Sequence, residues 1–165
     1  MRESSTTNIV ATMVELTGLL IVIVAGALFI SDTPDTSISQ TIATSSEVSW
    51  TAIARGAALG FFAFIGFEDM VNVAEEVKDP ERNLPNAILT ALVVTGVIYL
   101  LVVFVATSVV PPATLASSEA PLLSVVQRSS ARIPDGLFSL IALFAVANTG
   151  LLNFIMGSRL LYGMS

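Results

Sequence analysis

Cysteine and histidine are both absent from this 165-residue chain, and charged residues make up only 12% of it. Without thiols or imidazoles, a disulfide framework, a thiolate zinc site and histidine acid–base chemistry are excluded. The net charge of −6 argues against a nucleic acid partner, which needs a basic patch to neutralise its phosphates. We therefore expect no cofactor, no metal site and no nucleic acid partner.

Apolar residues take the place of the missing charges. Hydrophobic residues make up 54% of the chain, and the mean hydropathy is +0.84. A helix needs about 20 apolar residues to cross the hydrocarbon core, and several runs approach that length. The first run reaches Ile30 without a convincing cleavage site, which favours a true span over a signal peptide. The sequence predicts an all-α, multi-pass protein of the cell membrane, surrounded by lipid.

Four spanning segments are predicted, at about 8–30, 50–77, 86–110 and 136–160. The segments between them predict outer loops at 31–49 and 111–135, the second with a short amphipathic helix at 121–127, and a cytoplasmic loop at 78–85. The first outer loop has no Lys or Arg, which places it outside and the N-terminus in the cytoplasm. Two prolines in the cytoplasmic loop should prevent one regular helix from passing through it.

The second span contains a glycine followed by two carboxylates. Gly66 separates an apolar half from a mixed half, and Glu68 and Asp69 come directly after it. A charge at membrane depth is costly and usually faces a cavity or a partner. We interpret the segment as a helix broken near 65–67, the kind of helix that binds substrate in inverted-repeat transporters. Alternatively, Gly66 only permits close helix packing and the acids cap a half-helix.

Two longer motifs extend this pattern. Residues 61–68 read Phe-Phe-Ala-Phe-Ile-Gly-Phe-Glu, and residues 74–85 read Ala-Glu-Glu-Val-Lys-Asp-Pro-Glu-Arg-Asn-Leu-Pro. Together they resemble the sixth-helix signature of amino acid permeases of the amino acid–polyamine–organocation (APC) superfamily, and residues 158–164 resemble the end of that family's eighth helix.

The resemblance implies that the four spans correspond to helices five to eight of an inverted-repeat fold of five plus five helices. The family's Gly-rich first helix has no counterpart here. We therefore expect the remaining helices of a full permease to be partners of this segment, and the chain by itself to be inactive as a fragment or truncated product.

The resemblance also implies secondary active transport of amino acids or related amines, by proton- or sodium-coupled symport or by exchange. No enzyme chemistry is expected, and the absence of the phosphate-loop motif leaves ATP-driven pumping unsupported. Two alternatives stay open: a non-transporting membrane subunit, and an ion channel with the broken helix lining its pore. The narrow, Phe-rich break suits an occluded pocket better than an open pore.

Site residues follow from the same resemblance. Carbonyls freed at the break would accept from a substrate ammonium, and the expected substrate-binding residues are Phe62, Ala63, Phe64, Ile65 and Gly66. The expected coupling or gating residues are Glu15, Glu68 and Asn148.

Each coupling residue has a structural alternative. Some proton-coupled relatives carry a lysine near the position of Glu15, so an acid there is a departure from the family. Glu15 could instead reach the cytoplasmic interface, Glu68 could cap a half-helix, and Asn148 could hold neighbouring helices together.

Overall fold

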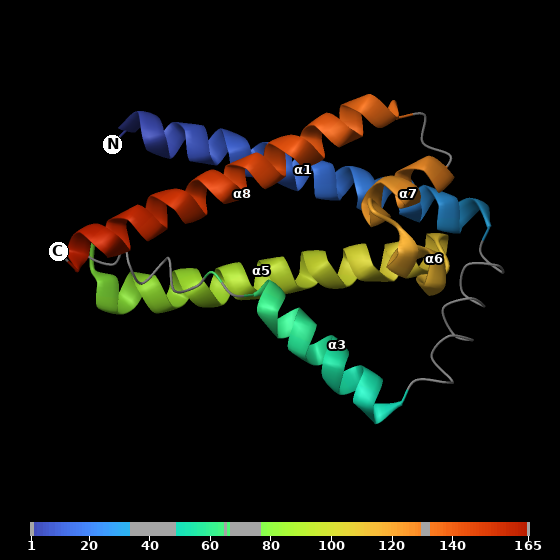
Figure 1. Cartoon of the computed structure of the whole chain (residues 1–165), viewed down its shortest axis with the longest axis horizontal. Helices are drawn as coiled ribbons and strands as arrows, with labels where there is room; N and C mark the ends of the chain where they lie inside the picture. The colour runs from blue at the N-terminus through green and yellow to red at the C-terminus, as the bar shows by residue number, and fades with distance from the viewer. Residues whose placement is uncertain (1, 34–48, 65, 67–76, 130–132, 165) are drawn as a thin grey trace. The chain divides into compact units, whose positions relative to one another are not determined.

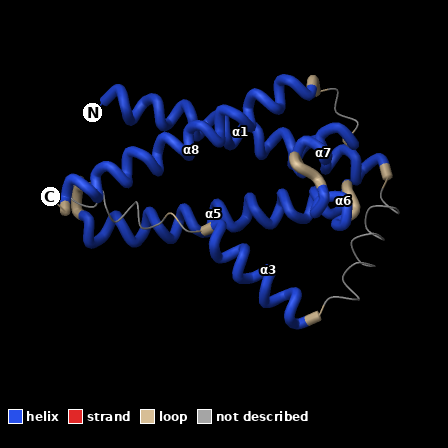
Figure 2. The backbone as a smooth tube through the Cα atoms, in the orientation of Figure 1, coloured by secondary structure: helices blue, strands red, loops and turns tan. Residues whose placement is uncertain are grey.

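The computed structural model describes residues 2–33, 49–64, 66, 77–129 and 133–164, and every regular element in these ranges is an α-helix. The all-α prediction is confirmed. The chain divides into two compact units, Met1–Thr41 with Leu101–Ser165 and Ile42–Leu100, which we describe separately. The helices (Figures 1 and 2) are α1 (Arg2–Asp32), α3 (Trp50–Ala63), α5 (Pro80–Val109), α6 (Pro112–Ser117), α7 (Pro121–Arg128) and α8 (Asp135–Gly163).

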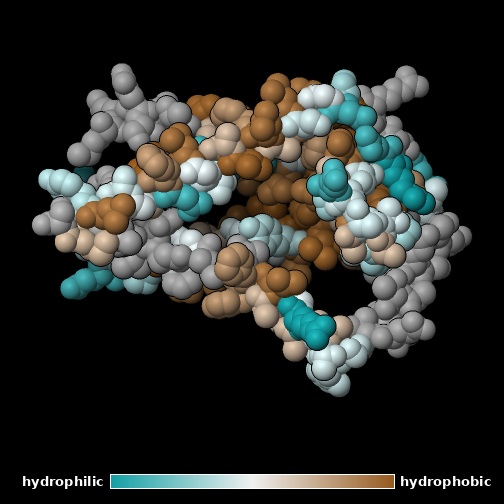
Figure 3. Space-filling view, in the orientation of Figure 1, coloured by the Kyte–Doolittle hydropathy of each residue, from teal (hydrophilic) through white to brown (hydrophobic). Residues whose placement is uncertain are grey.

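Three helices of the described part are long and apolar enough to cross a membrane: α5, α8 and the Ile9–Asp32 portion of α1. Large apolar side chains are exposed along all three, and the space-filling view shows much of the surface as hydrophobic (Figure 3). Such exposure is unfavourable in water and is satisfied by lipid or by other helices. The second predicted span, 50–77, begins with α3, and its expected second half lies mostly outside the described residues.

Proline and serine fix where several helices begin. Pro80, Pro112 and Pro121 each occupy the first position of a helix, where the missing N–H has no intrahelical partner to lose. At the start of α3, the Ser49 hydroxyl oxygen accepts a hydrogen bond of 3.3 Å from the backbone N–H of Ala52. This is the capping arrangement that satisfies an otherwise unpaired donor.

The start of α5 differs from the expectation. The helix begins at Pro80, six residues before the expected start at 86, so most of the predicted cytoplasmic loop at 78–85 is helical. The Asp79 carbonyl accepts from the N–H groups of Arg82 and Asn83 at 3.1 and 3.0 Å, which forms the first turn. Pro85 then lies inside the helix. It removes one hydrogen bond near the helix start, and the helix continues through it.

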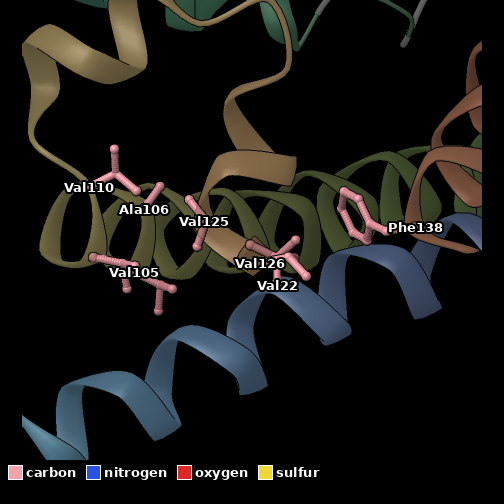
Figure 4. Packing of buried hydrophobic residues seen from close by; sticks show 8 residues of the cluster. Val22, Val105, Ala106, Val110, Val125, Val126 and Phe138 are labelled. Carbon is pink, nitrogen blue, oxygen red and sulfur yellow. The ribbon is translucent and has the colours of Figure 1, made fainter. Parts of the chain in front are cut away.

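The predicted second outer loop, 111–135, contains α6 and α7, and α7 falls where the amphipathic helix was expected. Its residues Val125 and Val126 are almost completely buried. They join a cluster (Figure 4) with residues of α1, α5 and α8 and with Val110, which directly follows α5; the other members are Val22, Val105, Ala106, Val109 and Phe138. The core of the first unit therefore gathers where the C-terminal parts of α1 and α5 and the N-terminal part of α8 meet α7.

Helices α1 and α8 pack along matching stripes. The stripe of α1 consists of Ala11, Glu15, Gly18, Val22 and Ala25, which are spaced alternately by four and three residues and are buried or half-buried. The stripe of α8 has the same spacing and consists of Phe138, Ile141, Ala145, Asn148 and Leu152. This spacing is the pattern of left-handed helix pairs whose side chains interlock. We call the contact between these two stripes the α1–α8 seam.

Glycines allow α1 to approach its neighbours closely. A Cβ added at Gly18 would lie 2.8 Å from Cγ2 of Ile141 on α8. At Gly26 it would lie 1.9 Å from Cγ1 of Val105 on α5, which is an impossible contact without movement. The packing of the first unit therefore depends on the absence of side chains at these two positions.

We predict that Gly26→Ala destabilises the protein, because the added methyl overlaps Val105. Overpacking of this kind typically costs about 1–3 kcal/mol, and the melting temperature of the purified protein in detergent measures it. Gly157→Ala on α8 is the control, since a Cβ there meets nothing within 4 Å. Equal melting temperatures for Gly26→Ala and the unmodified protein would contradict the close approach of α1 and α5.

Candidate transport site

The second unit contains the point where α3 stops. The helix ends at Ala63, and the N–H of Phe64 donates to the carbonyls of both Phe61, at 3.0 Å, and Phe62. This sharing tightens the last turn and satisfies part of the helix end. Gly66 follows with a φ of +139°, a conformation that side-chain-bearing residues rarely adopt. The chain therefore leaves its helical path inside the signature motif, in the region of the predicted break.

The expected substrate-binding residues differ in exposure. Phe62 is 72% exposed, and its neighbour Phe61 is 67% exposed. Phe64 is half-buried, and its ring lies 5.2 Å from the ring of Tyr99 on α5, with 54° between the ring planes. The side chain of Ala63 and all of Ile65 lie outside the described residues.

The end of α3 has a definite electrostatic character. Helix dipoles place partial negative charge at the C-terminus, where the last carbonyls point away from the helix. No acidic side chain lies within α3, and its one basic residue, Arg55, is two turns before the end. Such a helix end attracts a cation, and a protonated amine can donate hydrogen bonds to its carbonyls. The residues expected to form a second half-helix opposite this end, 67–76, lie outside the described residues.

The first unit brings together two of the three expected coupling residues. The amide Nδ2 of Asn148 on α8 donates a hydrogen bond of 2.8 Å to Oε1 of Glu15 on α1. Both side chains are half-buried. Glu15 is about 9 Å inside the apolar segment that begins at Ile9, at a rise of ~1.5 Å per residue. Among the structural alternatives, Asn148 therefore does connect neighbouring helices, and Glu15 is its partner.

The other residues of the two stripes around this bond are apolar. Within the α1–α8 seam, the neighbours of Glu15 are Ala11 and Gly18, and those of Asn148 are Ala145 and Leu152. The Glu15–Asn148 pair thus supplies the polar side chains of an otherwise apolar contact. An amide N–H donor suits an ionised carboxylate, which only accepts. A protonated Glu15 would instead have a hydrogen to donate.

The remaining expectations have no structural test. Glu68, with the neighbouring Asp69, lies outside the described residues, so its coupling role stays a prediction. The described residues hold no group of three or more acidic, histidine or cysteine side chains that could bind a metal ion. The end of α3 and the Glu15–Asn148 pair belong to different units, and each is described within its own unit.

Sequence reasoning missed two features of the site. Glu15 and Asn148 were each singled out but not paired, although the matching four-and-three spacing of their helices was a signal that could have joined them. Tyr99 was passed over as an aromatic residue in an apolar helix. No local pattern in the sequence distinguishes it from a lipid-facing tyrosine.

Comparisons with known proteins agree with the motifs. The family model described as "Amino acid permease" matches residues 1–165. Among curated relatives, the chain is 34% identical over 163 residues to cationic amino acid transporter 9, chloroplastic, of Arabidopsis thaliana, covering 99% of this chain and 27% of the relative. It is 33% identical over 109 residues to the branched-chain amino acid permease BcaP of Bacillus subtilis, covering 66% of this chain and 23% of the relative.

A methylthioribose transporter of Bacillus subtilis is similar to the same degree, 33% over 109 residues, with 66% of this chain and 23% of the relative covered. The chain thus spans about a quarter of the length of these relatives. No solved structure matches it. The family match over the whole chain, the signature at the end of α3 and the apolar helices lead to one conclusion: this multi-pass integral membrane protein belongs to the amino acid permease family.

Proposed function

We propose that the protein that carries this segment transports amino acids or related amines by a secondary active mechanism, without covalent chemistry. The observation that carries the proposal is the end of α3 at Ala63, followed by the positive φ of Gly66, inside the permease signature. Interrupted helices at membrane depth provide backbone groups that bind charged substrates. The permease family of the chain supports the same function.

In this mechanism the carbonyl end of α3 receives the substrate's ammonium group. The partial charge of the helix end favours the cation, and the low dielectric around it strengthens each hydrogen bond. Phe62 is one of two exposed aromatic side chains at this end, beside Phe61, and in the proposal it covers the apolar part of the bound substrate. The N–H groups at the start of the expected second half-helix would bind the substrate's carboxylate, and they lie outside the described residues.

The relatives leave the identity of the side chain open. Their names specify cationic amino acids, branched-chain amino acids and methylthioribose, a sugar that has no ammonium group and falls outside the amino acid and amine class. In this proposal the backbone carbonyls of α3 bind the substrate's ammonium group and do not contact its side chain. The proposal therefore stops at the amino acid or amine class and leaves the side chain to a substrate panel.

We further propose that the Glu15–Asn148 pair takes part in coupling transport to a proton or a sodium ion. The carboxylate lies between two packed helices and accepts one amide hydrogen bond at 2.8 Å. Protonation or cation binding changes which hydrogen bonds Glu15 can make, and so changes the contact between α1 and α8. A glutamine in place of Glu15 has the same size but cannot ionise, so it would lose this change of hydrogen bonding on protonation or cation binding.

The first prediction tests transport itself. Proteoliposomes containing the full permease that carries this segment should take up one or more members of a panel of cationic and branched-chain amino acids, with saturable kinetics. The uptake should follow an imposed proton or sodium gradient, or a preloaded amino acid in the case of exchange. Uptake of methylthioribose alone would contradict recognition through an ammonium group. A linear, unsaturable current would favour the channel alternative, and no flux of any kind would favour the non-transporting subunit.

A second prediction concerns Phe62→Ala. Removing the ring should raise the KM for uptake with little loss of expression, because Phe62 is exposed and contributes little to folding. Loss of an aromatic contact predicts a change of about tenfold. Phe61→Ala is the matched control, with the same ring on the neighbouring exposed position. An unchanged KM in Phe62→Ala would remove Phe62 from the site.

A third prediction concerns Glu15→Gln. Glutamine can still accept from Asn148 but cannot ionise, so helix packing should survive while the pH or sodium dependence of uptake changes. Rates of uptake measured across pH and sodium concentration test this. Glu119→Gln, an exposed acid outside the long helices, is the control. A pH and sodium profile equal to that of the unmodified protein would return Glu15 to a structural role.

A further inference from the structure

We infer that Tyr99 is a positioning residue for the transport site, acting through Phe64 on the end of α3. The inference rests on the proposed function, in which that helix end binds the substrate. Neither the signature motif nor the expected site residues include Tyr99, which lies on α5, 35 residues after Phe64.

The contact between the two rings is specific. Their centroids are 5.2 Å apart and the planes are inclined by 54°, a tilted arrangement within the range that aromatic pairs prefer. Gly96 lies one turn before Tyr99, and a Cβ built there would be 3.9 Å from Cζ of Phe64. The Phe64 ring therefore lies over a position without a side chain and against a ring.

This contact is also where α3 is held within its unit. Every described side chain of residues 50–62 is exposed, whereas Phe64, directly after the helix, is half-buried. Phe64 is the residue whose N–H closes the last turn on Phe61 and Phe62. A side chain that fixes Phe64 thereby fixes the direction of the carbonyls at the end of the helix.

Membrane depth agrees with this role. At ~1.5 Å per residue, Phe64 is about 21 Å along from Trp50, and Tyr99 is about 15 Å before the end of α5 at Val109. Tyr99 thus lies inside a helix that is long and apolar enough to cross a hydrocarbon core ~30 Å thick, and the Phe64 ring is in contact with it. In lipid, two helices gain little free energy by burying apolar surface against each other. The specific packing of the two rings is therefore what favours contact between the end of α3 and α5.

The test compares Tyr99→Leu with Tyr99→Phe. Tyr99→Leu removes the ring and should raise the KM of uptake by about two- to tenfold, the range expected from loss of a ring pair, with a smaller effect on kcat. Tyr99→Phe keeps the ring and should restore the KM. In a Phe64→Leu background, Tyr99→Leu should add nothing further, because the residue through which it acts is already changed.

A second measurement does not depend on transport. The 165 residues contain no cysteine, so Phe62→Cys introduces a single thiol into this segment at the end of α3. Its rate of alkylation by N-ethylmaleimide in membranes should change when Tyr99→Leu is added and stay the same with Tyr99→Phe. Gly96→Val gives an independent perturbation by crowding the Phe64 ring, and Gly96→Ala, at an ordinary contact distance, is its control.

The outcomes separate the two proposals. Altered alkylation in Tyr99→Leu without saturable uptake in any variant would support the positioning role of Tyr99 and reject the transport function. Saturable uptake with an unchanged KM and unchanged alkylation in Tyr99→Leu would reject the positioning role of Tyr99 and leave the transport function standing. An equal rise of KM in Tyr99→Phe would assign the effect to the hydroxyl group, and it too would overturn the ring contact as the cause.

Discussion

The absence of water from the hydrocarbon core is the constraint on which the rest of this structure depends. Backbone groups that leave a helix there must find partners within the protein. In the described residues the long segments are helical, and where α3 stops, the N–H of Phe64 is shared between two carbonyls. The same constraint applies to side chains: Glu15 is half-buried at depth, and an amide hydrogen bond from Asn148 compensates part of its lost hydration. The places where polar groups remain in the apolar helices are therefore the places where function is to be sought.

Packing between α1 and α8 explains how a carboxylate and an amide can meet there. Gly18 lets the backbone of α1 approach Ile141. This close approach lies one turn from Glu15 on α1 and two turns from Asn148 on α8, and it brings the short side chain of Asn148 within reach of Glu15. Small residues at helix contacts and polar side chains that bond across them are the usual means of association in membranes, where lipid competes equally for apolar surface. The seam combines both. Beside it, α7 adds a second kind of packing, since its two buried valines join one apolar cluster with residues of the same helices.

The sequence was sufficient for the class of the fold and for the region where α3 ends. Long apolar runs and the signature around Gly66 are local features, and local features survive in the folded chain. The start of α5 was misplaced because prolines were read as breaks, although Pro80 stands at the first helical position, where proline is favoured. The bond between Glu15 and Asn148 joins residues 133 positions apart, and its prediction requires the register of two helices as well as their spans. Tyr99 could not be found at all, because its partner is selected by the three-dimensional path of α3.

The alternating stripe on α1 has a consequence for the length of that helix. Each residue turns the helix by about 100°. One residue added or deleted between Glu15 and Val22 would therefore rotate the Glu15 side chain away from α8 and toward lipid, while the part of α1 that includes Val22 kept its position. A different side chain would then stand opposite Asn148, which would lose its acceptor. The number of residues between these two positions carries information that the individual apolar side chains do not. Along this helix, exchange of one aliphatic side chain for another should preserve the packing, whereas insertion or deletion of a residue should not.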